Sequence, residues 1–152
     1  MEGQVMGAKL MARLNLEWQI FLDSFAGLPD SALSESGVVG NWSIRDILGH
    51  ITTWENEALD GIAIVLAHEK GPGYSSYGGV DGFNAIKVNE KRAKPLNQIR
   101  RELVATHKSL LDRIADIPDS AVDAEFRRRF SNDTWAHYRQ HAKQIQAWRS
   151  KR

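Results

Sequence analysis

The chain contains 152 residues, of which 42% are hydrophobic and 26% are charged, and its formal net charge is +1. This composition is typical of one soluble globular domain, taken as residues 1–152, and it excludes a largely disordered chain. The sequence contains no cysteine, which excludes disulfides, thiolate ligands and a cysteine nucleophile, so histidines and carboxylates remain as candidate metal ligands.

No segment approaches the run of about 18 apolar residues that a membrane-spanning helix needs. The first residues lack the apolar core of a signal peptide, so we expect a cytoplasmic protein with no membrane partner. Charge is unevenly distributed: residues 126–152 carry eight Lys or Arg and one acidic residue, a local charge of +7, which leaves −6 on the rest. Such a segment can bind nucleic acid, but no nucleic-acid motif accompanies it, so we favour a solvated basic helix face.

The predicted elements begin with a helix from Gly7 to about Ala26, which has one wide apolar stripe. Gly27 and Pro29 end it, and a polar connection runs to Trp42, with a short helical turn expected at residues 29–33. The apolar stripe consists of Leu10, Leu14, Trp18, Phe21, Leu22 and Phe25.

A second helix is predicted from Ser43 to about Glu69, because Ser43 and Asp46 have the spacing of a capping box. His68 lies in its last turn, where a cation is favoured by the helix dipole. Residues 70–82 are rich in glycine and contain Tyr74 and Tyr77. This loop either covers a pocket or is a flexible connector, and the composition is compatible with both.

We expect Asp81 to cap a short helix that ends near Ala93, and Pro95 to open a third long helix. His107 lies near the edge of the apolar stripe of that helix and is a further candidate ligand or acid–base group, or else a boundary histidine. A second long connection is expected to reach Asn132, before a fourth helix begins at Thr134. The fold class is therefore all-α, a four-helix bundle with long connections between helices 1 and 2 and between helices 3 and 4.

The fourth predicted helix places His137 and His141 one turn apart, on the same face as two apolar residues, Ile145 and Trp148. His50 has the same relation to the apolar face of the second helix. A single inward histidine is most simply a hydrogen-bonded core residue. Three of them on two core faces favour a metal site, because three imidazoles with an open position form a recurring catalytic arrangement.

Helix geometry adds a constraint. His50 lies about 10 Å from the predicted start of its helix, and His137 and His141 lie roughly 5–10 Å from the start of theirs. The three can meet only if the two starts lie at the same end, so we expect helices 2 and 4 to run parallel, with the site near one end of the bundle.

Two stretches, Trp42-Ser-Ile-Arg-Asp-Ile-Leu-Gly-His50 and Thr134-Trp-Ala-His-Tyr-Arg-Gln-His141, resemble the DinB-like (YfiT-like) superfamily of bacterial four-helix proteins. The resemblance covers nearly the whole chain. It implies that His50, His137 and His141 bind a divalent metal, zinc or nickel first and iron as a further possibility, and that the protein forms a homodimer. It also implies a small-molecule substrate and, as in some relatives, a low-molecular-weight thiol cofactor.

The leading hypothesis is a metal-dependent enzyme for a small electrophilic substrate, either a thiol transferase or isomerase or a hydrolase. A metal held by three neutral imidazoles keeps its full charge and lowers the pKa of a bound thiol or water. Glu55, Asn84 and Tyr138 are candidate catalytic groups, with surface, cap or boundary roles as the alternative. Residues 127–129, all Arg, are candidates for attracting an anionic thiol or substrate. The competing hypothesis is a non-catalytic stress protein that binds metal or a small molecule.

Overall fold

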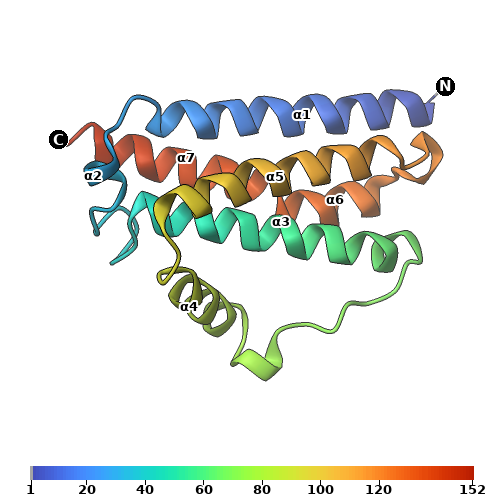
Figure 1. Cartoon of the computed structure of the whole chain (residues 1–152). Helices are drawn as coiled ribbons and strands as arrows, with labels where there is room; N and C mark the ends of the chain where they lie inside the picture. Colours follow the sequence, from blue (N-terminus) through green and yellow to red (C-terminus); the bar gives the residue numbers. More distant parts are fainter. Residues whose placement is uncertain (1) are drawn as a thin grey trace.

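The computed structural model describes residues 2–152, and the side chains of residues 7–152, and every regular element in that part of the chain is helical (Figure 1). The prediction of an all-helical protein is therefore confirmed. The α-helices are α1 (Glu2–Phe25), α2 (Asp30–Leu33), α3 (Ile44–Leu66), α4 (Val80–Lys91), α5 (Leu96–Ala115), α6 (Ala124–Asp133) and α7 (Trp135–Arg149). Two 3₁₀ turns, η1 (Ser75–Tyr77) and η2 (Asp119–Ala121), lie in the connections.

The long helices lie side by side, with α1 against α7 and α3 against α5 and α6 (Figure 1). Helices α3 and α5 run in one direction, and α1, α6 and α7 run in the other. Side-chain contacts at the two ends of α3 show that α6 and α7 run antiparallel to it. A guanidinium nitrogen of Arg129 in α6 donates to the carbonyl of Glu69, just beyond the end of α3, and Arg152 after α7 pairs with Glu35, before α3 begins. The expectation that helices 2 and 4 run parallel is therefore wrong.

The error arises because the expected second long connection is largely helical. Asp123 caps α6 by accepting from the backbone N–H of Phe126 at 2.8 Å, and Phe126 and Phe130, one turn apart, are buried. Because three arginines separate these two phenylalanines, the helical spacing of the apolar residues is hard to recognise in the sequence. The helix is interrupted at Thr134 (φ −120°, ψ −99°), and α7 continues from Trp135. The helical segment that carries His137 and His141, α6 followed by α7, thus begins near residue 124 and not near residue 134.

The start of α3 is formed as predicted. Ser43 Oγ accepts from the Asp46 N–H at 3.1 Å, and the Ser43 N–H donates to Asp46 Oδ2 at 3.0 Å, so the capping box is complete. Arg92, which follows α4, binds the same carboxylate at 3.2 Å. Lys91 Nζ donates to the carbonyl of Gly49 at 2.8 Å. The end of α4 is thereby held against the turn of α3 that carries the first site residue.

Of two other local expectations, one is confirmed and one is wrong. The short helical turn after Pro29 is confirmed as α2. Asp81 does not cap α4, because it is the second residue of the helix and Gly79 is at the N-cap position. The φ of Gly79 is 96°, a value that glycine adopts readily and that would be strained for an aspartate. Within the described residues, no helix is both long enough and apolar enough to cross a membrane. The core is formed by the inward stripes of the helices, including Leu10, Leu14, Phe21, Ile44, Ile47, Ile51, Ile99, Leu110 and Ile145.

Candidate metal centre

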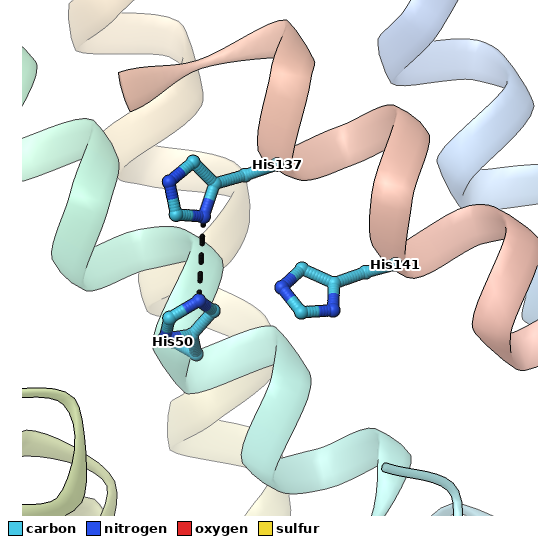
Figure 2. Close-up of side chains that lie close together, drawn as sticks. All are labelled: His50, His137 and His141. Atoms are coloured by element: carbon cyan, nitrogen blue, oxygen red, sulfur yellow. Dashed lines mark hydrogen bonds between the residues drawn. The ribbon is translucent and has the colours of Figure 1, made fainter. Parts of the chain in front are cut away.

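The three histidines singled out in the sequence, His50, His137 and His141, come together between α3 and α7 (Figure 2), and we call them the histidine triad. Each contributes one ring nitrogen to a group whose members all lie within 4.8 Å of one another. His50 and His141 are buried, and His137 is partly exposed. The triad is the group of this kind found among the described histidines and acidic residues.

Distances within the triad suit a small cation. His50 Nε2 and His137 Nδ1 lie 3.3 Å apart (Figure 2). Two nitrogens that each lie about 2.0–2.1 Å from a tetrahedral zinc ion are separated by about 3.3 Å. The widest separation in the triad, at most 4.8 Å, exceeds that value by about 1.5 Å, which a rotation of a side chain can close. The donor set therefore fits zinc or a similar borderline divalent metal.

A fourth side chain fixes the orientation of His141. Its Nδ1 lies 2.7 Å from Gln144 Oε1, and because an amide oxygen only accepts, Nδ1 carries the proton and donates. The second nitrogen, Nε2, is left unprotonated and faces the other two rings (Figure 2). Gln144 was missed from the sequence, although its position three residues after His141 on the same helix was a usable signal.

Two tryptophans border the triad. The Trp42 ring lies 4.9 Å from that of His50, and the Trp54 ring stacks on His137 at 5.1 Å with an interplanar angle of 25°. Trp54 is held in turn by Asn84 on α4, whose Oδ1 accepts from the indole N–H at 2.8 Å. The candidate Asn84 thus contacts a residue beside the triad and orients it.

Burial keeps the triad uncharged. Desolvation, followed by the charges of His141 and His137, lowers the pKa of His50 from 6.5 to about 2. Desolvation and then His141 lower the pKa of His137 to about 4, and burial also lowers the pKa of His141 against the opposing effect of Gln144. At neutral pH each ring is therefore neutral, with one nitrogen that carries a proton and one that offers a lone pair.

The other candidates lie in a separate place, which we call the core cluster: Trp18 of α1, Glu55 of α3, His107 of α5 and Tyr138 of α7. Glu55 is fully buried, and its Oε2 accepts from the Tyr138 hydroxyl at 2.5 Å and from His107 Nδ1 at 2.6 Å. His107 stacks on Trp18 with ring centroids 3.6 Å apart. Glu55, His107 and Tyr138 therefore bind one another, and none belongs to the triad.

The remaining sequence candidates are dispersed. His68 is exposed after the end of α3, where its Nδ1 lies 2.8 Å from Glu125 Oε2. The three arginines of α6 point in different directions: Arg127 covers the Trp135 ring at 5.2 Å, Arg128 is exposed, and Arg129 binds Glu69 and Glu125. They do not form one anion-binding cluster.

A cavity of about 630 Å³ lies between α3, α6 and the loop that contains residues 71–77. Tyr74 and Tyr77 of the glycine-rich loop line it, so this loop does cover a pocket. The Tyr74 ring is 5.3 Å from Trp54, the residue that also stacks on His137. Two aromatic contacts, from Tyr74 to Trp54 and from Trp54 to His137, therefore connect the cavity lining to the triad, although no histidine of the triad lines the cavity. Its other lining includes Glu57, Asp60, Phe126, Arg129, Phe130 and Asp133.

Comparison with family models matches residues 13–145 of the chain to the DinB superfamily. The matched segment contains all three histidines of the triad and every residue that lines the cavity. No curated protein and no solved structure matches the chain.

Proposed function

The chain belongs to the DinB superfamily, and from this membership and the geometry of the triad we propose that it is a divalent-metal-dependent enzyme for a small electrophilic substrate. His50, His137 and His141 are the proposed ligands, for zinc or nickel in the first place and iron as a further possibility. When bound there, the metal supplies a Lewis acid that lowers the pKa of a thiol or water at its open position.

The observation that carries this proposal is the approach of three neutral imidazoles from two helices, with no carboxylate among them. Neutral ligands leave the full positive charge on the metal, which favours activation of a nucleophile over purely structural binding. Gln144 holds the tautomer of His141, and Trp54, held by Asn84, fixes the ring of His137 and limits access of water.

The cavity supports a small-molecule substrate, since its volume of about 630 Å³ lies in the range of ligand sites. Its aromatic side chains suit an apolar body. Burial and the charge of Glu57 raise the pKa of Asp133 to about 6, so negative charge is already crowded there. A neutral or cationic substrate portion fits this lining better than an anionic one, and if the nucleophile is an anionic thiol, its charged part lies outside this cavity.

The proposal includes the wider architecture. We treat residues 1–152 as one domain and the fold as a four-helix bundle, in which α1, α3 and α5 are three rods and α6 followed by α7 is the fourth.

We place the protein in the cytoplasm as a homodimer; the exposed Leu16 and Ile20, one turn apart on α1, support an interface there. Nucleic acid is not a proposed partner, because basic residues such as Arg149 and Arg152 bind groups of this chain.

The first test is elemental analysis of the purified protein beside the His50→Ala/His137→Ala/His141→Ala variant. We expect close to one equivalent of zinc, nickel or iron in the wild-type protein and none in the variant. A variant that retains the metal would contradict the assignment of the ligands.

The second test is turnover by the metal-loaded protein. Electrophilic substrates are offered with and without a low-molecular-weight thiol, and the triple variant is the control for metal-independent reaction. Thiol-dependent conversion supports a transferase or isomerase, and thiol-independent conversion supports a hydrolase. A metal-loaded protein that converts none of them would favour the alternative, a non-catalytic metal- or small-molecule-binding stress protein.

A further inference from the structure

The core cluster joins the four long rods at one point. Glu55 of α3 accepts from Tyr138 of α7 at 2.5 Å and from His107 of α5 at 2.6 Å, and His107 lies flat against Trp18 of α1. Glu55 has no exposed surface, and Tyr138 has none either. The two hydrogen bonds are directed contacts between polar atoms, and they lie among the apolar side chains of the core.

Stability alone does not account for this cluster. A carboxylate withdrawn from water loses its hydration, and packed apolar side chains of similar volume usually replace a buried ion pair without loss. Two of its atoms, Glu55 Oε1 and His107 Nε2, are buried with no hydrogen-bond partner in the described structure. A buried polar network of this kind is best understood as specifying one arrangement of the helices.

The arrangement it specifies is the one that forms the triad. Glu55 follows His50 by five residues on α3, and Tyr138 is the neighbour of His137 on α7. Because each residue turns a helix by about 100°, rotation of α7 that withdraws the Tyr138 hydroxyl from Glu55 also displaces His137 and His141 relative to His50. The rest of the direct contact between α3 and α7 is limited, since α7 packs mainly against α1.

We propose that Glu55 is a positioning residue of the metal centre: by accepting from Tyr138 it sets the rotation of α7 against α3, and the triad converges as a result. His107, stacked on Trp18, holds the Glu55 carboxylate in the orientation that receives the hydroxyl. Glu55 and Tyr138 act through their helices and contact no ligand. This inference rests on the proposed function, in that the triad is taken to bind metal.

The test compares Tyr138→Phe, which removes only the hydroxyl that reaches Glu55, with Ser24→Ala. Ser24 is also buried, and its hydroxyl donates to the Phe21 carbonyl within α1, a helix that carries no ligand. Each variant loses one buried hydrogen bond, so both report the general cost of that loss. Zinc affinity is measured by competition with a chromogenic chelator, and the fold of each metal-free variant is verified by circular dichroism and its melting temperature.

We expect Tyr138→Phe to bind zinc at least tenfold more weakly than the wild-type protein, in the range seen when groups that orient metal ligands are removed, and Ser24→Ala to change affinity by less than about twofold. A folded Tyr138→Phe protein with wild-type zinc affinity would overturn the inference while leaving the proposed function intact. Wild-type protein that binds no zinc, nickel or iron would overturn both.

A second variant covers the case in which Tyr138→Phe does not fold. Glu55→Leu/His107→Phe/Tyr138→Phe replaces all three polar groups of the core cluster by apolar ones of similar size and leaves none of them buried without its partner. We expect this protein to fold and again to bind zinc at least tenfold more weakly. Wild-type affinity in this triple variant would contradict the positioning role as directly as it would in Tyr138→Phe.

Discussion

The histidine triad and the core cluster place the same side chain in opposite circumstances. In the triad, His50 Nε2 and His137 Nδ1 are hydrogen-bonded to each other at 3.3 Å, and no acidic group belongs to the set. In the core cluster, His107 donates to the carboxylate of Glu55 at 2.6 Å. The triad is therefore a set of neutral donors that could hold a cation, whereas the imidazole of the core cluster already has an acidic partner and joins helices.

The largest effect is expected from Glu55→Ala, which tests whether the core cluster contributes more than the triad to the free energy of unfolding. The change leaves His107 and the Tyr138 hydroxyl buried without their acceptor, so we expect the free energy of unfolding of the metal-free protein to fall by about 3–5 kcal/mol. Urea denaturation measures it. Glu57→Ala on the same helix is the control, expected within about 1 kcal/mol of wild type. An equally small change for Glu55→Ala would show that the core cluster does not hold the helices.

Replacing the triad should have the contrasting result. Removal of binding groups often leaves stability unchanged or improves it, so we expect His50→Ala/His137→Ala/His141→Ala to unfold within about 1 kcal/mol of the metal-free wild type. Zinc at about 100 times its dissociation constant should stabilise the wild-type protein by about 2.7 kcal/mol, or roughly 5–10 °C in melting temperature. Calorimetry with zinc or chelator checks this, and a zinc-dependent shift in the triple variant would argue against these ligands.

The two regions also differ in how far the sequence predicts them. The triad could be predicted because it depends on local facts: His137 and His141 are one turn apart, and the capping box at Ser43 fixes the start of the helix that carries His50. The core cluster depends on which helices are neighbours. Periodicity places Glu55 and Tyr138 on helices but does not pair them, so the sequence yields them only as separate polar candidates.

The relative direction of α3 and α7 shows the same limit. It depends on whether residues 124–133 are a loop or a helix, and the apolar signal there reduces to Phe126 and Phe130 around three arginines. If that stretch is a loop, the last rod begins about ten residues later, and the direction inferred for α7 is reversed. The convergence of the histidines was nevertheless predicted, because their faces do not depend on that choice.

A smaller effect tests whether the triad depends on groups that orient it. Gln144→Ala removes the acceptor that holds the His141 tautomer, so we expect zinc affinity to fall about 10-fold to 100-fold with little change in metal-free stability. Gln140→Ala is the matched control, since Gln140 is exposed, one turn earlier on α7. Equal zinc affinities for the two variants would mean that the tautomer of His141 is set without Gln144.

The smallest effect concerns a carboxylate outside both clusters, Asp133 in the cavity wall, where burial and Glu57 raise its pKa from 3.8 to about 6. A raised pKa means that the folded state holds the proton more tightly, so stability falls as the pH rises from about 4 to about 6 and stays lower above that window. Because the group remains partly solvated, we expect only about 1 kcal/mol at neutral pH.

Asp133→Asn should remove that cost, so the variant is expected to be about 1 kcal/mol more stable than wild type at pH 7.5 and equal to it near pH 4. Urea denaturation at the two pH values measures the difference. Asp60→Asn, at an exposed position in the same cavity, is the control and should lie within about 0.5 kcal/mol of wild type at both. A gain for Asp133→Asn that is the same at both pH values would assign the effect to packing and would remove the charge argument for a neutral or cationic ligand.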